Sequence, residues 1–311
     1  DIKQYCVESL QTNHKQYSSI VHKSDMRNVS LNTFESKVDV LCGGVPCQAF
    51  SLAGERRGLD DPRGQLIVEF NRLILECVPK IFFVENVRGL QSHNGGNTLK
   101  NILELFSNNG KYNVSSFVVN AWDYEVPQKR ERIIIYGIRN DIDHTKFVIP
   151  PRVASKPVLR DILMDVPESE GAQYPEKKYN VLRLVPPGGC WVDLPHEVQL
   201  EYMGNSIGSG GGKRGIARRL SMDEPSLTLL TSPQQKQTER CHPTETRPFN
   251  VGEYARIQTF PDSYIFHGSM MKKYEQIGNA VPVKLAFHIG KAFLKLLSKR
   301  SKKSSLPDAS A

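Results

Sequence analysis

Apolar and polar positions along the first half of the chain follow an order expected for strands alternating with helices. Apolar-rich runs at 38–42, 81–84, 114–119 and 132–138 have the length and composition of strands. Apolar positions three and four residues apart predict helices at 4–14, 65–77, 97–109 and 283–297. Alternating elements of this kind predict an α/β fold with a mostly parallel sheet.

The pattern changes near residue 149, where helical periodicity gives way to sequence rich in proline and glycine. Such sequence predicts loops and short strands, and therefore a second, smaller, loop-rich domain. The last residues, from Lys299 onward, are basic and are expected to be disordered. The predicted divisions are a first domain at 1–148, a second domain at 149–248, a return to the first domain at 249–298, and a tail at 299–311.

Composition excludes several classes of protein. With 39% hydrophobic and 24% charged residues, the chain is typical of soluble globular proteins. It has no apolar run long enough to span a membrane and no signal-peptide pattern, so we expect a cytoplasmic protein. Six scattered cysteines without a CxxC pair predict neither a zinc site nor a disulfide framework. Lysine and arginine exceed the acids by 8, which favours a polyanionic partner such as nucleic acid, although a solvated basic surface explains the excess equally well.

One cysteine is distinguished by its position. Cys47 follows the predicted strand 38–42 on a turn shaped by Gly43, Gly44 and Pro46. Such a turn presents a thiol to a cleft, as a nucleophile requires, whereas a buried structural cysteine is the alternative. Glu85 comes directly off the strand 81–84, and ligands of parallel sheets bind at the carboxyl ends of strands. We therefore expect Cys47 and Glu85 to share a cleft.

Four short motifs, taken in order, closely resemble those of the DNA (cytosine-5)-methyltransferases of bacterial restriction-modification systems. They are Pro46-Cys47-Gln48, Glu85-Asn86-Val87, Gln128-Lys129-Arg130-Glu131-Arg132 and Gly278-Asn279-Ala280-Val281-Pro282. The resemblance covers essentially the whole chain. It implies a Rossmann-like methyltransferase domain, a target-recognition domain, and methylation of carbon 5 of cytosine within a specific sequence of double-stranded DNA.

The resemblance also implies catalytic roles. The Cys47 thiolate would add to carbon 6 of the cytosine, which makes carbon 5 nucleophilic enough to accept a methyl group. Glu85 would act as the acid at ring nitrogen 3. Arg132 would hold the carbonyl oxygen of the base, and Arg130 would support the loop or a phosphate. The alternatives are an ion pair between Glu85 and Arg88, and a surface position for Arg132.

The implied methyl donor is S-adenosylmethionine, with no metal. By the same resemblance, Asp25 would accept a hydrogen bond from the adenine amine, Leu66 would pack on the adenine, Asn279 would line the methionine end, and Asp1 would bind the ribose hydroxyls. The target base must leave the duplex to be methylated. Predicted contacts to DNA, drawn from the loop after Cys47 and from cationic and amide side chains of the second domain, are Ser51, Arg63, Lys213, Arg214, Arg218, Gln237 and Arg240.

The chain departs from the family pattern in two places. It lacks the glycine-rich motif of the family's first strand, so we expect a gap at the centre of the sheet and a missing piece that comes from a longer protein or a second polypeptide. We also expect the chain alone to bind S-adenosylmethionine poorly. Glu125 stands where glycine is usual and predicts a different turn. One alternative to an active DNA methylase is a catalytically silent, DNA-binding fragment or subunit of a split methyltransferase. Another is an enzyme that methylates RNA.

Overall fold

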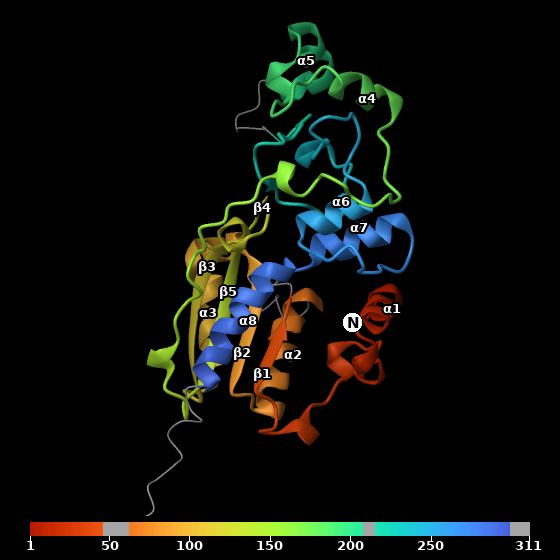
Figure 1. Ribbon diagram of the computed structural model, residues 1–311. Coiled ribbons are helices and arrows are strands. Elements are labelled where there is room, and N and C mark those ends of the chain that lie inside the picture. The colour runs from red at the N-terminus through yellow and green to blue at the C-terminus, as the bar shows by residue number, and fades with distance from the viewer. Residues whose placement is uncertain (46–61, 208–214, 299–311) are drawn as a thin grey trace, which may run out of the picture.

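The computed structural model describes residues 1–45, 62–207 and 215–298 (Figure 1). Its main sheet has four strands in the order β1-β2-β5-β3, which are Val40–Gly43, Ile81–Val87, Glu131–Arg139 and Tyr112–Asn120. β1 and β2 are parallel, but β5 runs antiparallel to both β2 and β3. The α/β class is confirmed, and the mostly parallel sheet is corrected to a mixed one. The connection between β3 and β5 is too short for a parallel crossover, so the chain reverses and β5 inserts between β2 and β3.

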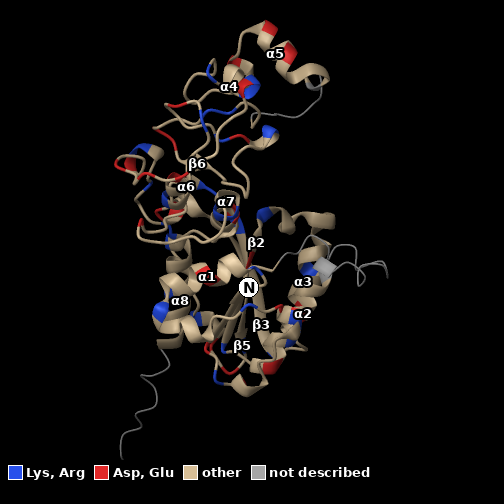
Figure 2. Ribbon diagram, turned by 90° about the vertical axis from the view of Figure 1, so that its right-hand side faces the viewer, with Lys and Arg blue, Asp and Glu red and all other residues tan. Residues whose placement is uncertain are grey.

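Helices cover both faces of this sheet (Figure 2). On one face, α2 (Pro62–Cys77) and α3 (Asn97–Ser107) bury Phe70 and Phe106 against Phe82. On the other face, α8 (Val283–Ser298) buries Phe293 with Ile81. Because side chains alternate along a strand, the neighbours Ile81 and Phe82 reach opposite cores. The strand predicted at 81–84 is therefore confirmed as part of β2, which is covered on both faces.

The N-terminal segment forms helices and no strand, and it lies to one side of the sheet, beyond β1 and α2 (Figure 1). It contains α1 (Gln4–Asn13) and the 3-10 helices η1 (Lys15–Ile20), η2 (Met26–Asn28) and η3 (Asn32–Phe34). Within the described residues β1 pairs only with β2 and forms the edge of a continuous sheet. The expectation of a gap at the centre of the sheet is therefore wrong for this part of the chain.

A polar seam joins α1 to α7 (Met270–Asn279) and the loop before it, which lie side by side in Figure 1. The hydroxyl of Ser9 donates to the side-chain oxygen of Gln276 at 2.7 Å. Thr12 Oγ1 lies 2.9 Å from His267 Nε2. The side chain of Asn13 exchanges hydrogen bonds of 2.7 and 2.8 Å with the backbone of Ile265. The beginning of the described chain is thus held against its last third.

The remaining residues form a region beyond the sheet (Figure 1). It holds the helices α4 (Glu176–Leu182), α5 (His196–Met203) and α6 (Val251–Ile257), and a two-stranded sheet of β4 (Gln128–Lys129) and β6 (Ser226–Leu227). Loops and a short strand were expected there, but α4 and α5 were not, because helices of 7 and 8 residues are too short to give a clear periodicity. The further 3-10 helices are η6 (Arg88–Gln91), η7 (His93–Gly96), η8 (Ala121–Tyr124), η9 (His144–Lys146), η10 (Leu159–Asp161), η11 (Trp191–Asp193), η12 (Gly204–Ser206) and η13 (Lys236–Thr238).

The predicted divisions near residues 148 and 248 stay predictions. Helices α6 and α7 pack with Leu159, Leu220 and Leu229 in one apolar cluster, so this cluster draws on both of the predicted domains. The predicted tail at 299–311 lies outside the described residues. Among the described helices, none combines the length and apolar character needed to cross a membrane.

Candidate active site

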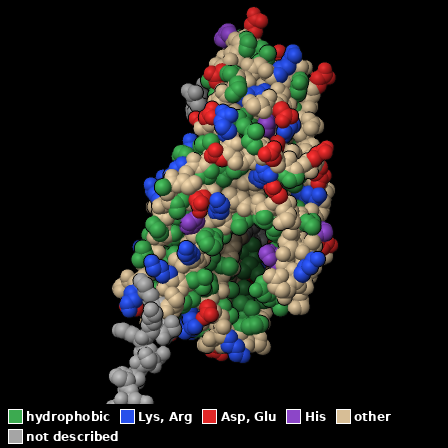
Figure 3. Space-filling view, viewed as in Figure 1, with side chains coloured by type: hydrophobic (Ala, Val, Ile, Leu, Met, Phe, Trp, Pro, Cys, Tyr) green, Lys and Arg blue, Asp and Glu red, His purple; other side chains and the backbone are tan. Residues whose placement is uncertain are grey.

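A cavity of about 1330 Å³ lies at the carboxyl ends of β1 and β2, and a hollow with a largely apolar wall is visible in Figure 3. Its lining comes from the ends of these strands, from the N-terminal segment, from α2, from residues 228–231, and from the end of α7. Seven of the predicted site residues meet there, although they are distant in sequence. They are Asp1, Asp25, Leu66, Glu85, Arg130, Arg132 and Asn279.

Glu85 and Arg132 form an ion pair at the floor of the cavity. Glu85 on β2 is opposite Ile134, and Val87 is opposite Arg132, so the two side chains share one face of the sheet. Arg132 Nε lies 2.7 Å from a carboxylate oxygen of Glu85, and the two side chains are 12% and 13% exposed. Arg88 instead pairs with Glu131, at 2.7 Å. The structure therefore favours neither an Arg88–Glu85 pair nor a surface position for Arg132.

Arg130 is buried beneath this pair. Its guanidinium donates to the backbone carbonyls of Leu229, Gly278 and Ala280 at 3.1–3.3 Å. Burial, and then the neighbouring Arg132, lower the pKa of Arg130 to about 9, so it stays charged at neutral pH. With 3% of its surface exposed, Arg130 supports the walls of the cavity.

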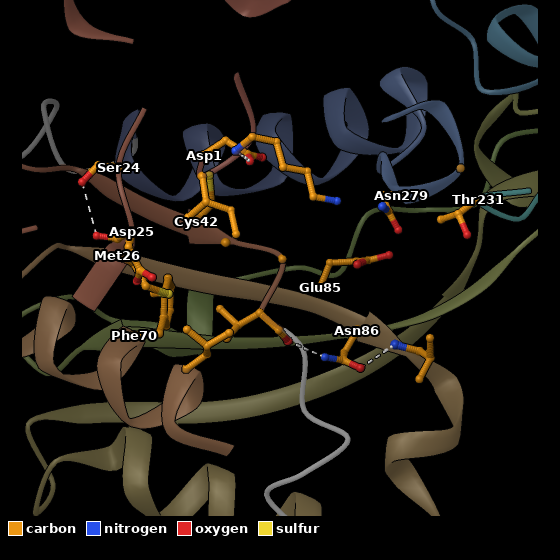
Figure 4. Close-up of a pocket in the computed structure, with 18 of the residues that line it drawn as sticks. Asp1, Ser24, Asp25, Met26, Cys42, Phe70, Glu85, Asn86, Thr231 and Asn279 are labelled. Carbon is orange, nitrogen blue, oxygen red and sulfur yellow. Dashed lines mark hydrogen bonds between the residues drawn. The ribbon is translucent and has the colours of Figure 1, made fainter. Parts of the chain in front are cut away.

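Asn86 fixes the chain at the point where it approaches Cys47. Its side-chain amide donates to the carbonyl of Val45 at 2.7 Å, and its oxygen accepts from the backbone N–H of Val87 at 2.8 Å (Figure 4). Gly44 and Val45 line the cavity. Cys47 itself, with Ser51, lies outside the described residues, so the structure places the approach to this cysteine and not its thiol.

The opposite end of the cavity is apolar with acidic groups at its margin. Phe70 and Leu66 of α2 line it, with Met26 and Asp25 nearby (Figure 4). The Asp25 carboxylate pairs with Arg27 at 2.6 Å and accepts from its backbone N–H, and these contacts lower the pKa of Asp25 to about 2. A Cβ on Gly43 would lie 2.8 Å from the ring of Phe70, so glycine is what lets β1 approach α2.

Asp1 and Asn279 reach the cavity from the two segments that the polar seam joins. The Asp1 carboxylate accepts from the backbone N–H of Lys3 at 2.8 Å, and the Asn279 side chain points toward Glu85 and Thr231 (Figure 4). Residues 228–231 form the facing wall, which the sequence did not reveal. No local sequence motif indicates that residues 228–231 line the cavity, because tertiary contacts to Arg130 and Gly278 place them there.

The predicted contacts to DNA differ in how far their side chains are exposed in the structure. Gln237 is exposed and Arg218 is half-buried. Arg240 is 9% exposed and donates to the carbonyls of Thr228 and Glu239 at 3.2 and 2.7 Å. Arg240 is therefore not presented to a groove in this structure. Lys213, Arg214 and the side chain of Arg63 lie outside the described residues.

The turn before Arg130 corrects one expectation. Glu125 adopts φ 61° and ψ 22°, the left-handed conformation that favours glycine. Its carboxylate lies 3.1 Å from His288 Nε2 and 3.7 Å from Lys284 Nζ on α8. The backbone is thus of the kind that glycine would supply, so glutamate does not require a different turn at this point.

Comparison with known proteins identifies the family. Residues 1–295 match the sequence profile of the C-5 cytosine-specific DNA methylases. The chain belongs to this family. The methylase is 49% identical to the Type II methyltransferase M.Sau96I of Staphylococcus aureus. The aligned 302 residues cover 96% of this chain and 70% of the relative. It is 48% identical to the Type II methyltransferase M.Eco47II of Escherichia coli, over 97% of this chain and 74% of the relative. The methylase is accordingly an enzyme of the DNA (cytosine-5)-methyltransferase class, of the restriction-modification type.

Solved structures confirm the fold of the methylase. An E. coli prophage protein described as a candidate DNA modification methyltransferase superposes with a TM-score of 0.66 at 24% identity, over 96% of this chain and 91% of that one. The Entamoeba histolytica methyltransferase EhMeth gives 0.65 at 15% identity, over 96% and 89%. A second polypeptide finds no support, because the curated relatives match nearly the whole methylase as single chains. The catalytically silent alternative is likewise not favoured.

Proposed function

We propose that this methylase transfers a methyl group from S-adenosylmethionine to carbon 5 of a cytosine that has left the DNA duplex, with Cys47 as a covalent nucleophile. The observation that carries the proposal is the Glu85–Arg132 ion pair of 2.7 Å, which lies in the same cavity as Asp25, Leu66 and Asn279. An acid and a cation are what a cytosine ring requires at nitrogen 3 and at its carbonyl oxygen.

The cavity is large enough for two reactants. Its volume of about 1330 Å³ exceeds the ~300–1,000 Å³ usual for a single small-molecule site. The apolar end, with Leu66 and Phe70, suits an adenine ring, and the acidic margin at Asp1 and Asp25 suits its amine and the ribose hydroxyls. Asn279 suits the methionine end. S-adenosylmethionine supplies an electrophilic methyl group when bound between these residues.

The base would occupy the end nearer Glu85. The Cys47 thiolate forms a bond to carbon 6, and the electron pair of the carbon 5–carbon 6 double bond moves toward carbon 5 and the ring. Glu85 donates a proton or a hydrogen bond at nitrogen 3, and Arg132 donates to the carbonyl oxygen, so both stabilise the charge that reaches the ring. After methylation, carbon 5 gives its proton to solvent, and the electron pair of that carbon–hydrogen bond forms the carbon 5–carbon 6 double bond again. The Cys47 sulfur leaves carbon 6 with the electron pair of its bond, and any proton on nitrogen 3 returns to Glu85.

The fixed position of Val45 supports this role for Cys47. The Asn86 amide holds the Val45 carbonyl at 2.7 Å, two residues before the cysteine and at the cavity wall. Among the predicted DNA contacts, exposed Gln237 and half-buried Arg218 remain candidates, together with Ser51, Arg63, Lys213 and Arg214. Because the relatives are bacterial Type II methyltransferases and the proposed substrate is DNA, we further propose a cytoplasmic, nucleoid-associated location in a prokaryotic cell.

Bisulfite sequencing tests the proposal directly. DNA from cells that express the complete gene should carry 5-methylcytosine within one recognition sequence, and cells that express the Cys47→Ser variant should carry none. Transfer RNA from the same cells provides the control for the RNA alternative. Methylation that persists in the Cys47→Ser cells would exclude Cys47 as the nucleophile. Methylated transfer RNA without methylated DNA would show that the substrate is RNA and not DNA.

A further inference from the structure

Two buried glutamines connect the walls of the cavity. Gln128 on β4 and Gln258 at the end of α6 are both 0% exposed, and the Gln128 amide donates to the Gln258 side-chain oxygen at 2.9 Å. Gln128 Oε1 accepts from the backbone N–H of Leu229 at 3.0 Å. Gln258 Nε2 donates to the carbonyls of Ile277 and Ala280 at 2.6 and 3.1 Å. We call this pair of side chains the amide relay.

The relay runs in one direction. A backbone donor at Leu229 requires an oxygen at the first amide, and backbone acceptors at Ile277 and Ala280 require a nitrogen at the second. The nitrogen of the Gln128 amide and the oxygen of the Gln258 amide are then left for each other, and they form the hydrogen bond between the two side chains. The orientation of both amide groups is therefore fixed. Exchanging the oxygen and nitrogen positions of either amide would break at least two of these hydrogen bonds.

The ends of the relay lie on two adjoining walls of the cavity. Leu229 belongs to the wall 228–231, and Ile277 and Ala280 flank Gly278 and Asn279 on the other side. The backbones meet closely, since a Cβ on Gly278 would lie 2.3 Å from the Leu230 carbonyl oxygen. A shift of either wall therefore changes where the Asn279 side chain enters the cavity.

We propose that Gln258, acting through Gln128, is a positioning residue that sets Asn279 relative to the wall 228–231 and so determines the affinity of the methyl-donor site. This inference rests on the proposed function. Gln258 touches neither reactant, and it acts through the peptide groups on both sides of Asn279. Arg130 makes a parallel connection between the same walls, so part of the connection stays in place when the relay is removed.

The test uses the complete gene product with the variants Gln258→Met, Gln128→Met and the double variant. Calorimetry with S-adenosylhomocysteine gives the affinity of the donor site without catalysis, and labelled methyl transfer to DNA gives KM and kcat. All measurements are made at a temperature where circular dichroism shows each variant to be folded. Gln199→Met is the matched control, because the Gln199 amide also donates to two backbone carbonyls, at 3.1 and 2.7 Å, but on α5.

We expect Gln258→Met to weaken S-adenosylhomocysteine about tenfold and to raise the donor KM by a similar factor, with a smaller change in kcat. The double variant buries no unpaired side-chain amide, but the buried backbone N–H of Leu229 still loses its acceptor, so only part of the lost melting temperature should be recovered. The weakened affinity should remain, because the relay no longer connects the two walls. If affinity returns to the wild-type value in the double variant, or is unchanged in Gln258→Met, the relay has no positioning role. If Gln258→Met does not fold, the double variant decides. A wild-type protein without methyl transfer would instead overturn the proposed function.

Discussion

Replacing Gly278 by alanine should distort the site through a single added methyl group. A Cβ at Gly278 would lie 2.3 Å from the Leu230 carbonyl oxygen, 2.5 Å from its carbon and 2.8 Å from the Thr231 nitrogen. Ordinary contact begins near 3.4 Å, so the two backbones must separate by about 1 Å, and no flexible side chain is available to move instead. Overpacking of this kind typically costs about 1–3 kcal/mol. It should more than cancel the ~1 kcal/mol that alanine contributes over glycine within a helix.

The matched control is Gly290→Ala in α8, where no atom lies within 4 Å of the added Cβ. Thermal unfolding should show Gly278→Ala to be less stable than the wild type by several degrees and Gly290→Ala to be slightly more stable. Because Asn279 follows directly, labelled methyl transfer should also show a raised donor KM in Gly278→Ala and an unchanged one in Gly290→Ala. Equal stability of the two variants would refute the close approach of the end of α7 to residues 230–231.

Other variants test the remaining parts of the site. Glu85→Gln should keep DNA binding and lose most methyl transfer, measured with labelled donor, and activity near that of wild type would remove Glu85 from the mechanism. The carboxylate of Glu275, bound by Lys272 and Lys3, has a pKa lowered to about 2, so its contribution to stability is present above about pH 4.5 and is lost as the pH falls toward 2. Chemical denaturation should show a smaller loss of stability in acid for Glu275→Gln, and identical pH profiles would contradict the ion pairs of Glu275 with these two lysines. DNA affinity should fall as salt rises, measured by anisotropy, and a salt-independent affinity would exclude phosphate contacts.

The sequence indicates the elements of the sheet region well, because each has a local cause. The apolar run 81–84 became β2 at Ile81–Val87, and the apolar stripe at 283–297 became α8 at Val283–Ser298. The direction of β5 has no such cause. Its apolar run would look the same in a parallel or an antiparallel strand, and only the length of the connection from β3 indicates the reversal.

The same distinction applies to the site. Glu85 and Arg132 could be placed in one site in advance because a family resemblance, and not the local pattern, relates them, but their ion pair was not predicted. Arg240 shows the opposite case, since a cation in a polar segment suggests a surface contact, but its guanidinium is buried against carbonyl groups. The amide relay escaped notice because glutamine is a common surface residue, and nothing in the sequence near Gln258 indicates that its side chain is completely buried.

The polar seam between α1 and α7 has a consequence for biosynthesis. Ser9, Thr12 and Asn13 find their partners more than 250 residues later, at Gln276, His267 and Ile265. Contacts of such large sequence separation form late in folding, because a long loop must close before they contribute any stability. On the ribosome, the described cavity therefore stays open on this side until nearly all of the described chain has been synthesised. A nascent chain that stops before α7 has Glu85 and Arg132 on their strands but no Asn279 to line the cavity with them, so the cavity is completed only after α7 has been synthesised.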